Sequence, residues 1–148
     1  MDDLVQFLRA RLDEDEQAAR RAGDSFRQIG ETGVIVATDG DRAEECASAN
    51  WAGIAEHIVR HDPARVLREV DAKRRMLDDL LAERHTIVED CWYTCAAATE
   101  ERDGDESCDE GRQGGPCDCG RDARVNRRLR LLVLPHADHP DYKDVWRP

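Results

Sequence analysis

Residues 61–84, HDPARVLREVDAKRRMLDDLLAER, decide how this chain folds. Asp62 is a good N-cap, and Pro63 suits the first helical position because proline fixes φ and lacks an N–H that would have no partner there. Apolar side chains then recur at helical spacing, at Val66, Leu67, Val70, Leu77, Leu80 and Leu81. The stretch therefore predicts a helix over residues 63–84 with one buried face.

Two more helices are predicted before this one. Apolar residues from Leu4 to Leu12 have helical spacing, and Gly23 ends a predicted helix over residues 3–22. Residues 49–60 repeat apolar side chains at i, i+3, i+4 and i+7. Three apolar stripes predict bundle-like packing of these helices around one core.

A β-branched run, Val34 to Thr38, lies between the first two helices and ends at the turn pair Asp39-Gly40. Phe26 to Ile29 is a candidate partner strand. Because an isolated two-stranded hairpin is marginally stable, we expect the first helix to cover it. The predicted class is mainly α with a minor β-hairpin, an α+β fold with a cysteine-containing loop, in a single domain over residues 1–148.

Charge and composition exclude some classes of function. The 148 residues carry a net charge of -11, which opposes general binding to nucleic acid, although residues 121–148 hold 7 basic and 4 acidic groups. The N-terminus lacks the regions of a secretory signal, and no stretch approaches the ~18 apolar residues of a membrane span. We therefore expect a cytoplasmic protein that does not enter a membrane.

Five of the six cysteines lie between His85 and Gly120. Tetrahedral zinc takes four thiolate or imidazole ligands, commonly from two close pairs. The pairs here are Cys91-x3-Cys95 and Cys117-x-Cys119, so the predicted ligands of a structural zinc ion are Cys91, Cys95, Cys117 and Cys119, with His85 and Cys108 as alternates. Cys46 stands apart and is expected to be a small buried apolar residue.

The sequence leaves other chemical roles of the cysteines open. They can be unligated thiols, redox disulfides, or half of a nucleophilic Cys/His pair, whose partners meet only in three dimensions. Residues 99–115 form an acidic, glycine-rich loop that we expect to be flexible. The sequence contains no common enzyme signature such as a P-loop, HExxH or GxSxG, so no catalytic residue is predicted.

Positive charge gathers in residues 121–130, where five arginines and one aspartate give a charge of +4. Such a segment can face an acidic partner or a phosphate backbone. A solvated helix face, or a counter-charge for the acidic loop, is the favoured explanation. His136 and His139 can hold a metal or transfer a proton, but they are favoured as surface or capping residues. His57 and His61, four residues apart, can chelate a metal if both lie on one helix face, but His61 is expected in the turn before Asp62. Residues 136–148 are expected to dock as an extended tail through Tyr142 and Trp146.

Three segments carry a resemblance: residues 2–12, residues 57–75 and residues 129–148, with the runs RHDPARVL and ADHPDY…WRP as their most specific parts. Together they resemble a family of small uncharacterised proteins of streptomycetes, related actinobacteria and their phages, classified only as a domain of unknown function. The resemblance implies a cytoplasmic actinobacterial protein and transfers no catalytic residue. Similar proteins tend to carry cysteines just before the last apolar segment, which favours Cys117 or Cys119 as a ligand. His136 departs from the expected aromatic.

These observations predict a small interaction or regulatory module that binds another protein and has a structural zinc site. The first alternative is a nucleic-acid-associated regulator that uses residues 121–130. The second is an enzyme with a Cys/His pair, a class for which the sequence offers least support.

Overall fold

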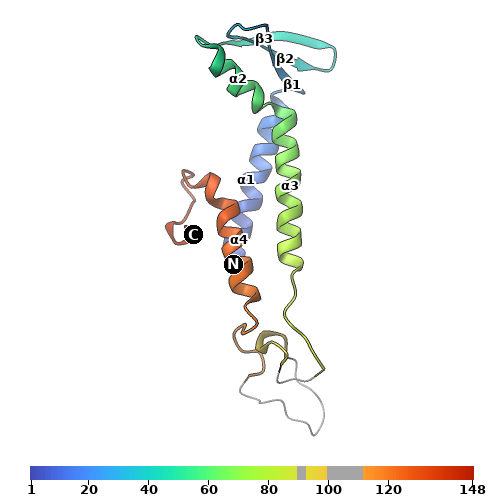
Figure 1. The fold of residues 1–148 in the computed structure, drawn as a ribbon, viewed down its shortest axis with the longest axis vertical. Coiled ribbons are helices and arrows are strands. Elements are labelled where there is room, and N and C mark those ends of the chain that lie inside the picture. The colour runs from blue at the N-terminus through green and yellow to red at the C-terminus, as the bar shows by residue number, and fades with distance from the viewer. Residues whose placement is uncertain (90–92, 100–111) are drawn as a thin grey trace. The chain divides into compact units, whose positions relative to one another are not determined.

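The computed structural model describes residues 1–89, 93–99 and 112–148 (Figure 1). The chain divides into two compact units, residues 5–76 and residues 1–4 with 77–148, and the single domain over residues 1–148 stays a prediction. The helices are α1 (Asp2–Arg21), α2 (Ala52–Arg60), α3 (Pro63–Ala82) and α4 (Arg121–Val133). The strands β1 (Ser25–Gln28), β2 (Val34–Asp39) and β3 (Arg42–Ser48) form one antiparallel sheet, which confirms the α+β class.

The capping signal at the start of α3 is confirmed. The Asp62 carboxylate accepts a hydrogen bond from the Arg65 N–H at 2.8 Å, as an N-cap residue does. Of the predicted apolar stripe, Val70, Leu77 and Leu80 are buried, while the other members are half-buried. The cap and the stripe thus determine where α3 begins and which face it buries.

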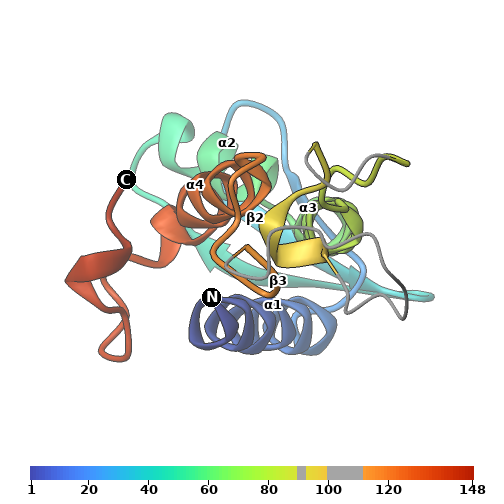
Figure 2. The ribbon, with the colours of Figure 1, turned by 90° about the horizontal axis from the view of Figure 1, so that it is seen from below.

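In the unit of residues 5–76, α1 and α3 lie side by side (Figure 2). Arg74 of α3 reaches Asp13 and Glu16 of α1, each at 2.6 Å. These ion pairs are partly exposed and contribute little stability, so the apolar residues supply most of it. The buried apolar residues of this unit are Val5, Phe7, Leu8, Leu12, Ala19, Ile35, Ala55 and Val70.

The sheet has one strand more than predicted. β2 pairs with β1 in the expected hairpin and also with β3 across the Asp39-Gly40 turn, with a bulge between Ile35 and Val36. All seven residues of β3 are exposed, so no apolar alternation marks this strand in the sequence. Because β3 extends to Ser48, α2 begins at Ala52 and not at residue 49.

The cover of the sheet is α2 and not α1, which corrects the expectation from the sequence. α2 packs against β1 and β2, and both Ala55 of α2 and Ile35 of β2 are fully buried (Figure 1). Gln28 of β1 also donates a hydrogen bond to the Ala52 carbonyl of α2 at 3.4 Å. α2 provides the closer apolar face, because it follows the sheet in the chain after a short connection.

In the unit of residues 1–4 and 77–148, the C-terminal segment differs from the extended tail that we expected. It contains the 3-10 turns Leu134–His136 and Asp144–Trp146. Trp146 is buried, with the Tyr142 ring edge-on at 5.8 Å, and Lys143 pairs with Asp3 at 2.8 Å. Buried apolar residues of this unit are Leu4, Leu77, Leu80, Cys95, Ala96, Val125, Leu129, Val133 and Trp146.

Across the described residues, no helix combines the length and the apolar character that crossing a bilayer requires.

Candidate metal centre

Three separate segments of one unit supply the side chains of the candidate metal centre. His85 lies in the segment that follows α3, Cys95 precedes the 3-10 turn Ala96–Ala98, and Cys117 and Cys119 precede α4. The Cys95 N–H donates to the Thr86 carbonyl at 2.8 Å and joins the first two segments. This main-chain hydrogen bond therefore places the segment of His85 beside that of Cys95.

The four side chains form one compact cluster. His85, Cys95, Cys117 and Cys119 each offer one ligand atom, and all four atoms lie within 4.8 Å of one another. His85 Nδ1 is 3.4 Å from Cys95 Sγ and 3.7 Å from Cys119 Sγ, and the Sγ atoms of Cys117 and Cys119 are 3.7 Å apart. None of the three cysteines is in a disulfide.

These separations match those of a metal-bound cluster. Zinc–sulfur bonds of about 2.3 Å and zinc–nitrogen bonds of about 2.0 Å at the tetrahedral angle place two sulfurs about 3.8 Å apart, and sulfur and nitrogen about 3.5 Å apart. Cys95 is 1% exposed and the other three residues are half-buried. The cluster is therefore compatible with one metal ion at its centre.

Hydrogen bonds favour the thiolate form of Cys119. The backbone N–H groups of Thr86 and Arg121, and then His85, lower the pKa of the Cys119 thiol to about 5, against the opposing effect of desolvation. Burial instead raises the pKa of Cys95. Because the thiolate is the form that binds metals, Cys119 is prepared to act as a ligand at neutral pH.

Two further side chains, Asp122 and Arg121, lie behind His85. The Nε2 atom of His85, on the far side of the ring from Nδ1, is 3.7 Å from a carboxylate oxygen of Asp122. Asp122 in turn accepts a hydrogen bond from Arg121 at 2.8 Å. A carboxylate behind a ligating histidine holds the ring and its tautomer, as is common at metal sites.

Asp118, between the two close cysteines, ties their loop to the rest of the site. Its carboxylate accepts hydrogen bonds from Arg112 at 2.6 Å and from the Ala96 N–H at 3.1 Å. Arg112, and then the Ala96 N–H, lower the pKa of Asp118 to about 2. The carboxylate is therefore charged at neutral pH and links the loop before α4 to the turn after Cys95.

The predicted ligands are only partly within the described residues. Cys95, Cys117 and Cys119 lie in the cluster, together with His85, which the sequence offered only as an alternate. Cys91 and Cys108 fall outside the described residues, so a ligand set that includes Cys91 stays a prediction. The sequence signal for His85 was weak, because a single histidine lies ten residues before the nearest clustered cysteine.

Other candidate residues do not join a cluster of this kind within the described part of the chain. His61 Nδ1 lies 2.9 Å from the His57 carbonyl, and His139 Nδ1 accepts the Asp141 N–H at 3.1 Å. Cys46 is exposed on β3 and not buried as expected, because β3 is an uncovered edge strand.

Most arginines of residues 121–130 form hydrogen bonds or ion pairs with other residues of the chain. Arg121 donates to the Glu83 carbonyl at 2.7 Å, while Arg124 and Arg128 reach the Glu83 carboxylate at 2.9 and 3.1 Å. Arg130 donates to Asn126 at 2.7 Å. Much of the positive charge of α4 therefore faces one carboxylate in the segment that carries His85.

The family comparison covers the whole chain. The model of a family described as a family of unknown function (DUF6221) matches residues 1–148. No curated protein and no solved structure matches the chain. The function of the protein is therefore inferred from the chemistry of the site.

Proposed function

Since the chain belongs to DUF6221, a family of unknown function, we propose that it is a small interaction and regulatory module closed by one structural Zn²⁺. The observation that carries the proposal is the spacing of the ligand atoms of His85, Cys95, Cys117 and Cys119, which lie within 4.8 Å of one another. Zinc suits three thiolates and one imidazole in tetrahedral geometry.

The ligand set favours a structural role for the ion. Catalytic zinc keeps one coordination position for water or substrate, whereas four protein ligands fill the tetrahedron. The ion would cross-link the segment after α3, the turn after Cys95 and the start of α4. With aromatic residues at only 5% of the chain, such a cross-link offers stability that a thin core lacks.

Exposed apolar side chains beside the centre support an interaction role. Ile87 is 67% exposed and Tyr93 is 76% exposed, and both lie in the segments that carry His85 and Cys95. Where such side chains form a contiguous apolar patch, the patch marks a protein contact site. The proposed partner is therefore a protein, and the thiol-rich site suits the reducing cytoplasm.

The test is native mass spectrometry of protein purified without chelator, with a thiol count on the same sample. We expect one zinc ion per chain and three thiols that become reactive only after chelation. Four protected thiols would mean that Cys91 or Cys108 replaces His85. Metal-free protein with every thiol reactive would contradict the proposal.

Matched variants locate the ion. Cys119→Ser and His85→Ala should lose the zinc, because each removes one of four ligands. Cys46→Ser is the control, since Cys46 is an exposed cysteine on β3 outside the cluster. Equal zinc content in Cys119→Ser and Cys46→Ser would place the ion elsewhere.

The enzyme alternative has one observation in its favour, because His85 Nδ1 lies 3.7 Å from the Cys119 sulfur. In metal-free protein this pair resembles an activated nucleophile. Rapid alkylation of Cys119 in protein as purified, before any chelator is added, would support that class. Protection of Cys119 by the ion would exclude it.

A further inference from the structure

We propose that the outward face of α4 is a docking site for an acidic, amphipathic helix of a partner protein. The α4 face is formed by Ala123, Arg124, Arg127, Arg128 and Leu131. The inference rests on the proposed role of the protein as an interaction module, and it specifies where the partner binds and what chemistry the partner has.

The shape of the α4 face suits a helix. Its five side chains line a hollow of about 340 Å³. Ala123, Arg127 and Leu131 follow one another at four-residue intervals, and Arg124 and Arg128 form a second row beside them. The rows extend over about 12 Å of helix axis, which is about two turns of a partner helix.

One of the residues that line the hollow exposes apolar surface. Leu131 is 50% exposed although it belongs to a helix whose opposite side, at Val125, Leu129 and Val133, is fully buried. The helix thus has one apolar stripe for its own core and a second apolar position outside. A partner helix with an apolar residue facing Leu131 would bury this surface.

The arginines that line the hollow determine the charge of the partner. Three of the five lining residues are arginines and none is acidic. The Glu83 carboxylate holds Arg124 and Arg128 in fixed positions, at 2.9 and 3.1 Å. Within the described residues, the Arg127 side chain makes no hydrogen bond or ion pair. Arg127 is therefore available for a partner carboxylate between two arginines that are already ordered.

An acidic helix fits this face better than nucleic acid does. Leu131 and Ala123 occupy positions where a phosphate-binding surface would carry further polar or basic groups. The net charge of -11 and the Glu83 carboxylate beside two of the arginines also oppose a polyanion of high charge density. A single partner helix with a few carboxylates and one apolar stripe would contact the same arginines with less electrostatic repulsion from the rest of the acidic chain.

The test uses a displayed library of short helical peptides in which charged positions vary among Glu, Gln and Lys, and apolar positions among Leu, Ala and Ser. Selection on the full-length protein should enrich peptides with Glu beside a Leu stripe. The Kd of selected peptides should rise about tenfold for Arg127→Glu, because an attraction becomes a repulsion. A peptide with one Glu→Lys change should recover affinity for that variant.

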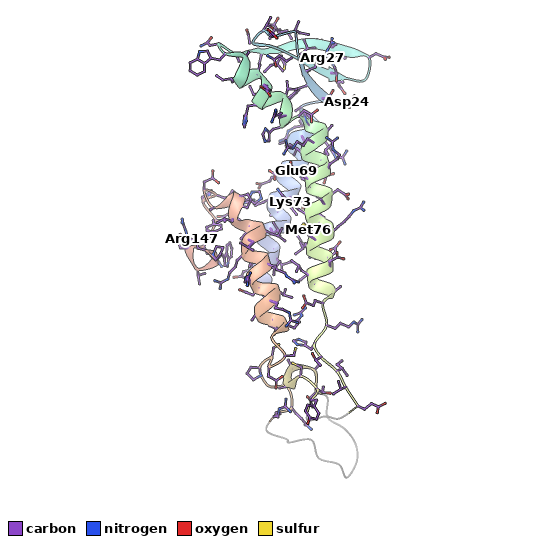
Figure 3. All side chains as sticks on the ribbon, viewed as in Figure 1. Asp24, Arg27, Glu69, Lys73, Met76 and Arg147 are labelled. Carbon is purple, nitrogen blue, oxygen red and sulfur yellow. The ribbon has the colours of Figure 1, made fainter. Side chains whose placement is uncertain are left out.

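Two controls match the variants in exposure and secondary structure. Arg68→Glu changes an exposed arginine of α3, and Met76→Ser changes an apolar residue that is 52% exposed on the same helix (Figure 3). Neither control should change the Kd, whereas Leu131→Ser should raise it several-fold. Circular dichroism of each variant establishes that it is folded.

Several results would overturn the docking proposal. These are enrichment of basic peptides, a Kd that Arg127→Glu leaves unchanged, tighter binding of a labelled DNA duplex that depends on Arg127, or a dimer of the protein alone that Arg127→Glu dissociates. Zinc content measured on the same samples separates the two proposals. Zinc-free protein that still binds acidic peptides through Arg127 contradicts only the metal centre, and zinc-loaded protein that selects no such peptide contradicts only the docking site.

Discussion

At the scale of single residues, Asp122 shows how the candidate metal centre depends on groups that do not touch the metal. The carboxylate lies 3.7 Å from His85 Nε2 and is itself held by Arg121. A histidine that ligates through Nδ1 must carry its proton on Nε2, and a carboxylate on that side stabilises this tautomer. We therefore expect Asp122 to orient His85, the one candidate ligand that is not a cysteine.

Replacement of this carboxylate tests its role. We expect Asp122→Asn to lower the affinity for zinc by about 10- to 100-fold, because the His85 ring loses the charged group behind it. Competition with a chromogenic chelator measures the affinity. Asp138→Asn, at an exposed position of the same unit, should bind zinc like the original protein. Equal affinity in both variants would remove Asp122 from the site.

At the scale of elements, the start of α3 rests on one capping residue. Asp62→Ala removes the acceptor of the 2.8 Å hydrogen bond from the Arg65 N–H. We expect the free energy of unfolding to fall by about 1 kcal/mol, as measured by urea denaturation. Asp79→Ala, at an exposed position inside the same helix, should change it by less than about 0.5 kcal/mol. A smaller loss for Asp62→Ala than for Asp79→Ala would contradict the role of the cap.

Two glycines give a second prediction at this scale, with opposite signs. Gly23 ends α1 with a φ of 101°, and an added Cβ would lie 2.7 Å from the Thr38 carbonyl oxygen of β2. Gly23→Ala should therefore lower the free energy of unfolding by about 1–3 kcal/mol. Gly53 lies in α2 with no atom near an added Cβ, so Gly53→Ala should raise it by about 0.5–1 kcal/mol. Urea denaturation of both variants measures the signs, and equal signs would contradict this account of Gly23.

At the scale of the whole molecule, the candidate centre belongs to one of two compact units. All four candidate ligands lie within residues 77–148, and the sheet with α2 lies within residues 5–76. Metal binding contributes to the stability of the segments that it joins. Removal of the metal should therefore affect the two units unequally.

Hydrogen exchange measures this difference. After chelation we expect the backbone amides of residues 83–89, 93–99 and 112–120 to lose protection, because these are the segments that the ion would join. Amides of β1, β2 and α2 should exchange at nearly unchanged rates. Cys46→Ser protein is the control that keeps its metal until chelation. Uniform loss of protection in both units would contradict a locally acting centre.

α1 and α3 could be predicted because their sequence signals are local. Capping at Asp62 and apolar spacing along α1 and α3 act within a few turns, so the predicted bounds agree with the structure to within two residues. β3 escaped prediction because its stability depends on pairing with β2 and not on its own apolar pattern. The prediction that α1 covers the sheet was wrong for a similar reason. Periodicity shows that one face of a helix is buried, but it does not show which element buries that face.

The sequence alone determined α1 and α3, the acidic composition and the kinds of side chain that a metal centre needs, because each follows from residue type and short-range spacing. Tertiary structure decided which of those side chains meet. His85 and Cys119 are 34 residues apart, and the fold brings Nδ1 and Sγ to 3.7 Å. The Arg121 side chain, which donates to the Glu83 carbonyl at 2.7 Å, joins the segments on either side. Metal ligation depends on positions in space, whereas the sequence orders residues along the chain.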